Sequence, residues 1–374
     1  MRIAVVQSFY SNSLPSGENR VVEDQVRALR EAGHEVLLVR QDTDDLQGLL
    51  YPVRTALNVA LSAGFDPTPQ LREFRPDVVH VHNLFPNISA RWLSAWKGPI
   101  VASLHNYRLT CSNGLFFRDG QICTECAERG SRSAIQHACY RKSRMATLPL
   151  AVSRKRARDD FANVSVVITT SELSDEVVHR YIDDTLRTVV IPNFGPEMHS
   201  AVEAVSESAT WLSVGRFTPE KGFVELVRDW PQGEPLLIIG DGPDQVEIQN
   251  AASKKLVEVQ PSIGRAEFRS RLASSQGLIF PSRWFEADPQ VVVEAMALGV
   301  PVIAFHMNAV ARIVLESQAG AVYSSAAELA AAMASVRESR ARMAVAARDE
   351  FSRRWAKERW IERITDLYEQ VTCG

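Results

Sequence analysis

The sequence lacks the marks of a membrane-spanning or secreted protein. It contains no run of roughly 18 or more apolar residues, the length that a transmembrane helix needs. Arg2 precedes only the apolar run 3–6, which is too short for a secretory signal, so we expect a cytoplasmic protein. The 5 cysteines, without such a signal, indicate a reducing compartment.

A large excess of charge of either sign is also missing. The 42 Lys+Arg and 45 Asp+Glu leave a net charge of -3, which excludes a general nucleic-acid binder with a globally basic surface. We find no low-complexity tract beyond an alanine-rich stretch at 326–334. An ordinary composition, 45% apolar, remains in 374 residues, and this length predicts two domains of about 150–200 residues each.

Short apolar runs alternate with helical patterns along the chain. They predict strands at 2–7, 35–39, 77–82, 99–103, 164–169, 188–191, 210–214, 235–239, 256–259, 277–280 and 301–305. This alternation predicts an α/β fold with two Rossmann-like, doubly wound domains. The turn cluster 192–196 marks the boundary, so we expect domains at 1–192 and 193–355 and a terminal helix at 356–374 that packs back toward the first domain. Ligands are expected in the cleft between the domains, outside the carboxyl ends of the strands.

Two glutamates eight positions apart, Glu286 and Glu294, flank a predicted loop-to-helix junction. Pro289 suits the first turn of that helix, whose free N–H groups would face phosphate or sugar oxygens. Glu294 lies on an otherwise apolar helix, where a carboxylate needs a partner, and the two hydroxyls of a cis-diol would serve. The alternative is a surface-facing glutamate on an amphipathic helix.

A second motif follows the strand 210–214. Arg216 and Lys221 place two cations on a glycine-containing loop, which fits a pyrophosphate, although a solvated basic turn is the alternative. The loop is not a Walker motif, because G-x-x-x-x-G-K-[ST] is absent. A weaker signal is Gly17, within Pro15–Asn19, where a glycine would let the backbone approach a phosphate.

Three histidines, His80, His82 and His105, lie at the carboxyl ends of predicted strands. A metal site is disfavoured, because the helical H-x-x-x-H spacing and an adjacent acidic residue are both absent. The predicted cleft also carries no Asp-x-Asp motif, since the aspartates of 42–45 lie in a polar loop. We therefore expect no catalytic metal.

Four cysteines form the pattern C-x11-C-x2-C-x12-C inside a polar insertion at about 108–140: Cys111, Cys123, Cys126 and Cys139. In a reducing compartment this spacing favours a structural, tetrahedral zinc site. Free thiols or one disulfide are the alternatives. Cys373, near the end of the chain, is expected to be free.

Together these motifs resemble a retaining glycosyltransferase of family 4 (group 1), with the GT-B fold of two facing Rossmann-like domains. Further support comes from Gly33-His34-Glu35-Val36 and from the run Glu294–Pro301. Two departures leave the identity of the donor sugar open. Ser16–Asn19 replaces the family's usual paired glycines, and Asp288–Pro289 replaces its usual glycine after the first glutamate.

The resemblance implies a role for each matching position. Glu294 would hold the ribose, Glu286 the donor sugar, and His105 the transferred sugar. Arg216 and Lys221 would neutralise the diphosphate, which Gly17 would approach from the other domain. Backbone and loop contacts to sugar, phosphate and nucleobase would come from Asp288, Pro289, Gln290, Val291, Ile263 and Gly264.

These roles imply a hexosyltransferase that uses a nucleotide-diphosphate sugar and an acceptor hydroxyl in polysaccharide or glycolipid assembly. The family's front-face attack implies that a donor phosphate oxygen takes the acceptor proton, without a protein nucleophile. Alternatives from other classes are a GT-B nucleotide-sugar 2-epimerase and a non-enzymatic nucleotide-sugar binder. An epimerase would turn over the donor without an acceptor.

The segment 129–158 is a local charge anomaly, with nine Lys/Arg and no acidic residue. The cations are Arg129, Arg132, Arg141, Lys142, Arg144, Arg154, Lys155, Arg156 and Arg158. Apolar residues among them, such as Met145 and Leu148, predict a basic helix with an apolar side, which could contact an anionic membrane and bring the enzyme to a lipid-linked saccharide. A solvated helix face or a soluble anionic acceptor is the alternative.

Overall fold

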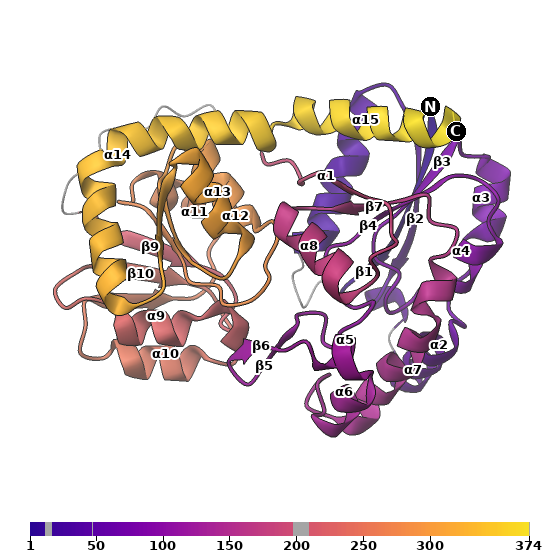
Figure 1. Ribbon diagram of the computed structural model, residues 1–374, viewed down its shortest axis with the longest axis horizontal. Helices are drawn as coiled ribbons and strands as arrows, with labels where there is room; N and C mark the ends of the chain where they lie inside the picture. The colour runs from indigo at the N-terminus through magenta and orange to yellow at the C-terminus, as the bar shows by residue number, and fades with distance from the viewer. Residues whose placement is uncertain (12–16, 47, 197–208, 374) are drawn as a thin grey trace. The chain divides into compact units, whose positions relative to one another are not determined.

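The computed structural model describes residues 1–11, 17–46, 48–196 and 209–373. The chain forms two compact units. Unit 1 comprises Met1–Arg118, Cys123–Ile191 and Trp360–Gly374, and unit 2 comprises Asp119–Ile122 and Pro192–Arg359. Each unit is a parallel β-sheet with helices packed around it (Figure 1).

The sheet of unit 1 has the strand order β2-β1-β3-β4-β7-β8. Its strands are β1 (Arg2–Phe9), β2 (Glu35–Asp42), β3 (Val78–Val81), β4 (Ile100–Ser103), β7 (Val166–Thr169) and β8 (Thr188–Val190). Every neighbouring pair is parallel, and β1, next to the edge strand β2, aligns Ile3 with Val36 on one side and with Val78 on the other. Such strands are buried on both faces, which explains their nearly continuous apolar sequences.

The helices of unit 1 connect these strands. They are α1 (Gly17–Glu31), α2 (Tyr51–Leu61), α3 (Thr68–Phe74), α4 (Arg91–Ala95), α5 (Glu125–Arg129), α6 (Arg132–Gln136), α7 (Arg144–Asp160), α8 (Glu172–Tyr181) and α15 (Lys357–Cys373), with the 3-10 turn η1 (Asp44–Leu46). α15 belongs to this unit from Trp360 onward, and its Tyr368 is buried beside His80 of β3. α7 continues through Pro149.

The sheet of unit 2 has the strand order β11-β10-β9-β12-β13-β14. Its strands are β9 (Trp211–Val214), β10 (Leu236–Ile239), β11 (Val257–Gln260), β12 (Leu278–Phe280), β13 (Val302–Phe305) and β14 (Gly320–Tyr323). The helices are η2 (Pro219–Lys221), α9 (Phe223–Asp229), α10 (Gln245–Ala252), α11 (Arg265–Ala273), α12 (Gln290–Ala297), α13 (Ala309–Ser317) and α14 (Ala326–Arg354). Successive residues of a strand enter opposite cores: Leu278 and Phe280 join one cluster, and Ile279 joins the other.

The predicted α/β class with two parallel-sheet domains is confirmed, and a strand lies at each predicted position. Three strands were missed. β14 closes the edge of the second sheet, and the two-residue strands β5 (Phe117–Arg118) and β6 (Gln121–Ile122) form a hairpin in the predicted insertion. Within the described residues, no helix is long and apolar enough to cross a membrane.

Candidate functional site

In unit 1 the strand order reverses between β1 and β3, so the loops that follow these strands diverge and leave room for a ligand. Asn83, just after β3, ties the two loops together. Its backbone N–H donates to Gln7 Oε1 at 2.8 Å, and its backbone oxygen accepts from the Ser8 N–H at 2.6 Å. The predicted Gly17 begins α1 next to this edge, and a Cβ built on it would have no atom of the described residues within 4 Å. Pro15 and Ser16 of the same motif lie outside the described residues.

The three predicted histidines lie at the carboxyl ends of β3 and β4, but they have different roles. His80 is fully satisfied, because its Nδ1 lies 2.6 Å from Tyr368 Oη and its Nε2 lies 2.8 Å from Ser103 Oγ. His82 Nδ1 lies 2.9 Å from His105 Nε2, so His82 orients the ring of His105. Burial lowers the pKa of all three, that of His80 to about 3, and they are therefore uncharged at neutral pH.

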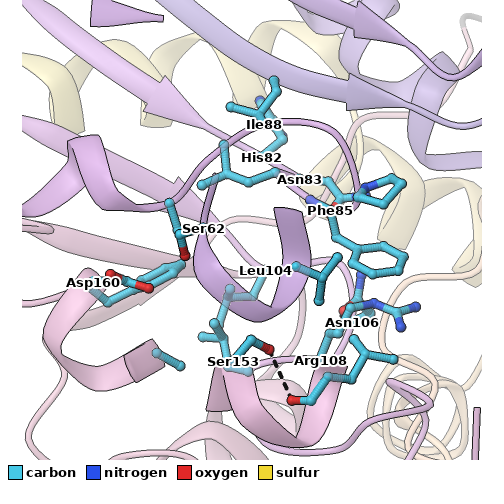
Figure 2. Close-up of a pocket in the computed structure, with 18 of the residues that line it drawn as sticks. Ser62, His82, Asn83, Phe85, Ile88, Leu104, Asn106, Arg108, Ser153 and Asp160 are labelled. Atoms are coloured by element: carbon cyan, nitrogen blue, oxygen red, sulfur yellow. Dashed lines mark hydrogen bonds between the residues drawn. The ribbon is translucent and has the colours of Figure 1, made fainter. Parts of the chain in front are cut away.

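A cavity of about 150 Å³ lies between α2, α7 and the loops after β3 and β4 (Figure 2). Its wall is mainly carbon, from residues such as Leu84, Leu104 and Leu150. Three of its lining side chains nevertheless carry buried polar atoms without a hydrogen-bond partner: His82 Nε2, Asn58 Oδ1 and Arg108 Nε. This cavity could not be predicted from a motif, because its lining comes from separate segments that only the fold brings together.

The four predicted zinc ligands are free thiols in the structure, so the alternative of a disulfide among them is not found. Burial raises the pKa of Cys126 to about 11, and the charges of Cys111 and Cys139 add to this rise. Among the residues that the structure describes, no group of three or more His, Cys, Asp or Glu side chains is arranged to hold a metal ion. The zinc site therefore stays a prediction.

In unit 2 the predicted glutamate and cation motifs lie at the switch point of the sheet, the place where the strand order reverses. The strand order reverses between β9 and β12, where a Rossmann-like sheet binds its ligand. Arg216 and Lys221 follow β9, and Glu286 follows β12. Gly222 permits the contact between the two loops: its φ is +70°, and a Cβ there would lie 2.4 Å from the Pro281 carbonyl oxygen.

Glu286 is a buried carboxylate with a complete set of partners. It forms an ion pair with Lys221, accepts from Ser282 Oγ at 2.5 Å and accepts from Trp284 Nε1 at 3.2 Å. Both of its carboxylate oxygens are thus engaged, and the ammonium of Lys221 is held in place. Arg216 differs, because its side chain is exposed and makes no ion pair with the described part of the chain.

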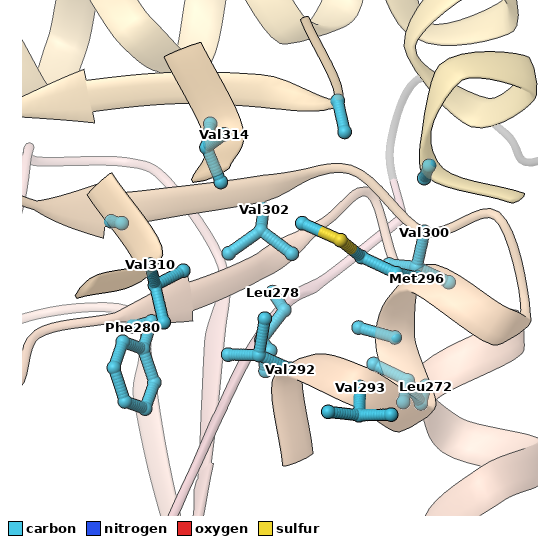
Figure 3. Packing of buried hydrophobic residues seen from close by; sticks show 14 of the residues in the cluster. Leu272, Leu278, Phe280, Val292, Val293, Met296, Val300, Val302, Val310 and Val314 are labelled. Carbon is cyan, nitrogen blue, oxygen red and sulfur yellow. The ribbon is translucent and has the colours of Figure 1, made fainter. Parts of the chain in front are cut away.

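Glu294 lies on α12, whose other side chains pack into the core of unit 2. Figure 3 shows Val292, Val293 and Met296 of this helix against strand residues such as Leu278 and Val302. Glu294 is only 3% exposed, so the alternative of a surface-facing glutamate is wrong.

The partners of Glu294 are arginines that sequence reasoning missed. Arg265 donates to Oε1 through Nε at 3.1 Å and Nη2 at 2.5 Å, while Arg269 Nε lies 3.5 Å from Oε2. No group in the described part of the chain donates a hydrogen bond to the buried Oε2, which can therefore accept one from a ligand. The available signal was the position of Arg265, directly after the predicted nucleobase loop. In that loop Ile263 packs on the core, and Gly264 is the exposed N-cap residue of α11.

The side chain of Asp288 points to structural partners rather than to open space. Its carboxylate accepts from the backbone N–H of Asn193 at 2.8 Å, from Asn193 Nδ2 at 2.9 Å and from Trp355 Nε1 at 2.9 Å. Burial raises the pKa of Asp288 to about 6, against the opposing effect of these hydrogen bonds. Only its backbone is therefore left for the predicted contact.

The three residues after Asp288 lie at the start of α12. Pro289 is the N-cap residue, so the helix begins one position later than Pro289 at N1 would require. Gln290 and Val291 form the first turn, where backbone N–H groups lack helical partners. Gln290 Nε2 is a further buried donor, and it makes no hydrogen bond with the described residues. This end of the helix therefore has a side-chain donor available for a ligand.

Two family models match the chain. The model described as Glycosyltransferase Family 4 matches residues 15–194, and the model described as Glycosyl transferases group 1 matches residues 208–339. A phosphatidyl-myo-inositol mannosyltransferase of Mycolicibacterium smegmatis is 26% identical over 353 residues, or 86% of this chain and 80% of the relative. An amylovoran biosynthesis glycosyltransferase of Erwinia amylovora is 34% identical over 99 residues, but these are only 25% of this chain and 28% of that relative.

Solved structures share the whole fold. Sucrose-phosphate synthase of Thermosynechococcus elongatus aligns with a TM-score of 0.70 and 17% identity, covering 100% of this chain and 99% of that chain. Anabaena HepE in complex with UDP aligns with a TM-score of 0.60 and 15% identity, covering 99% and 100%. The two parallel-sheet units thus define a GT-B fold. The chain belongs to the group 1, family 4-type glycosyltransferases and is a transferase.

Proposed function

We propose that this transferase moves a hexose from a nucleoside-diphosphate donor to an acceptor hydroxyl with retention of the anomeric configuration. The observation that carries the proposal is the charged set at the β9/β12 switch point of unit 2. It combines a preordered cation, Lys221, with an exposed one, Arg216, and a buried carboxylate, Glu294, whose Oε2 accepts no hydrogen bond from the described residues. A nucleoside diphosphate needs cations beside its phosphates and a hydrogen-bond acceptor beside its ribose hydroxyls, and these groups would supply both.

The nucleoside end of the donor is assigned to Glu294. A ribose carries adjacent hydroxyl donors, and Glu294 Oε2 is a buried acceptor that lacks a donor. Arg265 holds the other oxygen and neutralises the carboxylate. Ile263 and Gly264, immediately before Arg265, would flank the nucleobase.

The diphosphate end is assigned to Arg216, Lys221 and the free N–H groups of Gln290 and Val291. Negative charge grows on the diphosphate as the glycosidic bond breaks, and preordered cations and amides stabilise that charge without reorganising. Lys221 is preordered by its ion pair with Glu286, which is in turn assigned to hydroxyls of the donor sugar. We propose that this set acts without a divalent ion.

Groups of unit 1 complete the proposed reaction. Gly17, with open space around it, would approach the diphosphate, and His105, held by His82, would donate or accept a hydrogen bond at the transferred sugar. His105 is uncharged, so it acts as a neutral hydrogen-bonding group rather than as a cation. A phosphate oxygen of the donor would take the acceptor proton, which leaves no step for a protein nucleophile.

For the acceptor we propose a saccharide or lipid-linked saccharide of cell-surface polysaccharide or glycolipid assembly. Relatives named for amylovoran biosynthesis and for mannosyl transfer to phosphatidyl-myo-inositol support a polymeric or lipid-bound acceptor.

A structural zinc ion on Cys111, Cys123, Cys126 and Cys139 is also proposed. It is supported by their spacing in the sequence, and its role would be to order the insertion.

The test is turnover of a panel of UDP- and GDP-sugars by the purified chain with membrane and polysaccharide extracts as acceptors. We expect transfer that persists in excess EDTA, and a product whose anomeric proton coupling in NMR matches that of the donor. Arg216→Ala should lower turnover roughly 100- to 1000-fold, because it removes a cation that would stabilise the charge growing on the diphosphate. Arg228→Ala, which removes an exposed cation of unit 2 elsewhere, should leave turnover unchanged. Inversion of configuration, or loss of activity restored by Mg²⁺, would contradict the proposal.

A further inference from the structure

Exposed large apolar side chains are concentrated on one corner of unit 1. Of the eleven such side chains in the described part of the chain, seven lie on α2, on the turn before it, or on α7. We call these seven the α2/α7 face: Leu49, Leu50, Val53, Leu57, Leu61, Met145 and Leu148. Leu49 is 97% exposed and Met145 is 87% exposed. Exposed apolar side chains that gather on neighbouring elements in this way indicate an interaction surface.

The orientation of α2 makes this patch a property of the fold. Val53, Leu57 and Leu61 follow one another at intervals of four residues and so form one stripe along the helix. Asn58 lies on the other side, where it is buried and donates to the Pro86 carbonyl oxygen. The helix therefore turns a polar residue inward and its leucine stripe outward, the reverse of an ordinary surface helix.

α7 extends the same surface. α2 packs against α7 (Figure 1), and the Arg156 guanidinium of α7 donates to the Ala60 carbonyl oxygen of α2. The predicted apolar side of α7 is divided: Leu150 and Ala151 are buried within unit 1, whereas Met145 and Leu148 are exposed. The two exposed residues lie in the first two turns, next to the basic segment that precedes the helix.

Cations without ionic partners accompany the face. Five exposed residues on or beside the two helices make no ion pair with the described part of the chain: Arg54, Arg141, Lys142, Arg144 and Lys155. No acidic residue occurs at 46–65 or at 129–158. Asp159, near the end of α7, is the nearest exposed carboxylate on that helix. Apolar side chains accompanied by unneutralised cations complement an anionic lipid surface.

We propose that the α2/α7 face docks the enzyme on an anionic phospholipid bilayer, with its leucines and Met145 in the headgroup boundary and its cations on the lipid phosphates. This deepens the proposed acceptor class and rests on the proposed function only for its purpose, which is to bring the enzyme to a lipid-linked acceptor. Binding to lipid needs neither donor nor acceptor. Its failure is therefore distinguishable from failure of the transferase proposal.

The test is flotation of the full chain with vesicles of phosphatidylcholine alone, or of equal parts phosphatidylcholine and phosphatidylglycerol, at low and high salt. We expect binding to the anionic vesicles that weakens with salt, since each cation near such a surface contributes about fivefold in affinity. The double substitution Val53→Ser with Leu57→Ser should reduce binding about tenfold or more by removing inserted apolar area. Arg54→Gln with Arg144→Gln should reduce mainly the salt-sensitive part.

A matched control is available in unit 2, where Val246 and Leu256 are exposed to a similar degree. Val246→Ser with Leu256→Ser should leave vesicle binding unchanged. Met145→Ser with Leu148→Ser repeats the test on α7, should the α2 variant lose its helical circular dichroism. Absence of binding at low salt, or equal loss in the control, would overturn the proposal. So would a dimer in sedimentation velocity that the α2 variant abolishes, since that result assigns the face to a second copy.

Discussion

Asp288 gives the stability of unit 2 a specific dependence on pH. The carboxyl group has an ordinary pKa of 3.8, and burial raises this value to about 6 in the folded chain. The native state therefore binds a proton more tightly than the unfolded state does. Stability from this group is fully present below pH 3.8 and is lost as the pH rises through about 6.

The size of the effect follows from the shift. A rise of about two pKa units corresponds to roughly 3 kcal/mol at pH values above both pKa values. Because the residue is only partly buried, solvent screening reduces this figure, and we expect about 2 kcal/mol between pH 4 and pH 7.5. The three donors from Asn193 and Trp355 act in the opposite direction, since they favour the ionised form.

The assay is urea unfolding followed by tryptophan fluorescence, with the native chain and Asp288→Asn measured at each pH. The variant loses an acceptor at every pH, so the informative quantity is how the difference in free energy of unfolding changes with pH. We expect the native chain to lose about 2 kcal/mol relative to the variant between pH 4 and pH 7.5. Asp349→Asn, an exposed carboxyl of the same unit, is the control. A difference that stays constant, or grows in favour of the native chain, refutes the reasoning.

Two further predictions concern the remaining carboxylate and the thiols. Glu294→Gln should weaken binding of UDP or GDP by roughly 1–3 kcal/mol in titration calorimetry, because a charged acceptor is lost. It should also abolish any preference over the 2′-deoxy nucleotide, whereas unchanged affinity would remove the ribose assignment. Elemental analysis of protein purified without chelator should find zinc that Cys126→Ser loses, and its absence from the native protein would reject the zinc site.

The fold was largely predictable because parallel strands are buried on both faces. Runs such as 301–305 stay apolar at every position, and this pattern is hard to confuse with a helix when turns flank it. β14 was missed because it is not buried on both faces. It lies at the sheet edge, begins with Gly320 and is only partly buried, so its sequence carries little apolar signal.

Of the site, only residues that belong to a motif with recognisable spacing could be predicted. Glu286, Glu294 and Lys221 could be selected from motifs, but the partners Arg265, Ser282 and Trp284 depend on how separate loops meet. The exposed apolar stripe of α2 could not be predicted, for a different reason. Val53, Leu57 and Leu61 repeat like the buried face of an ordinary helix, and only the structure shows that this face is exposed.

Three carboxylates within nine residues therefore have three different electrostatic environments. Glu286 is balanced by an ammonium and Glu294 by the guanidinium groups of Arg265 and Arg269, whereas the described residues offer Asp288 only neutral donors in direct contact. A carboxylate with a cationic partner can exchange contacts with a charged or hydroxylated ligand while it remains ionised. Asp288 has no cationic partner in direct contact among the described residues, so moving it would leave its three hydrogen-bond donors without their acceptor. The segment 286–294 thus contains one group fixed by its contacts and two groups able to bind a ligand, and this division follows from their partners rather than from the spacing.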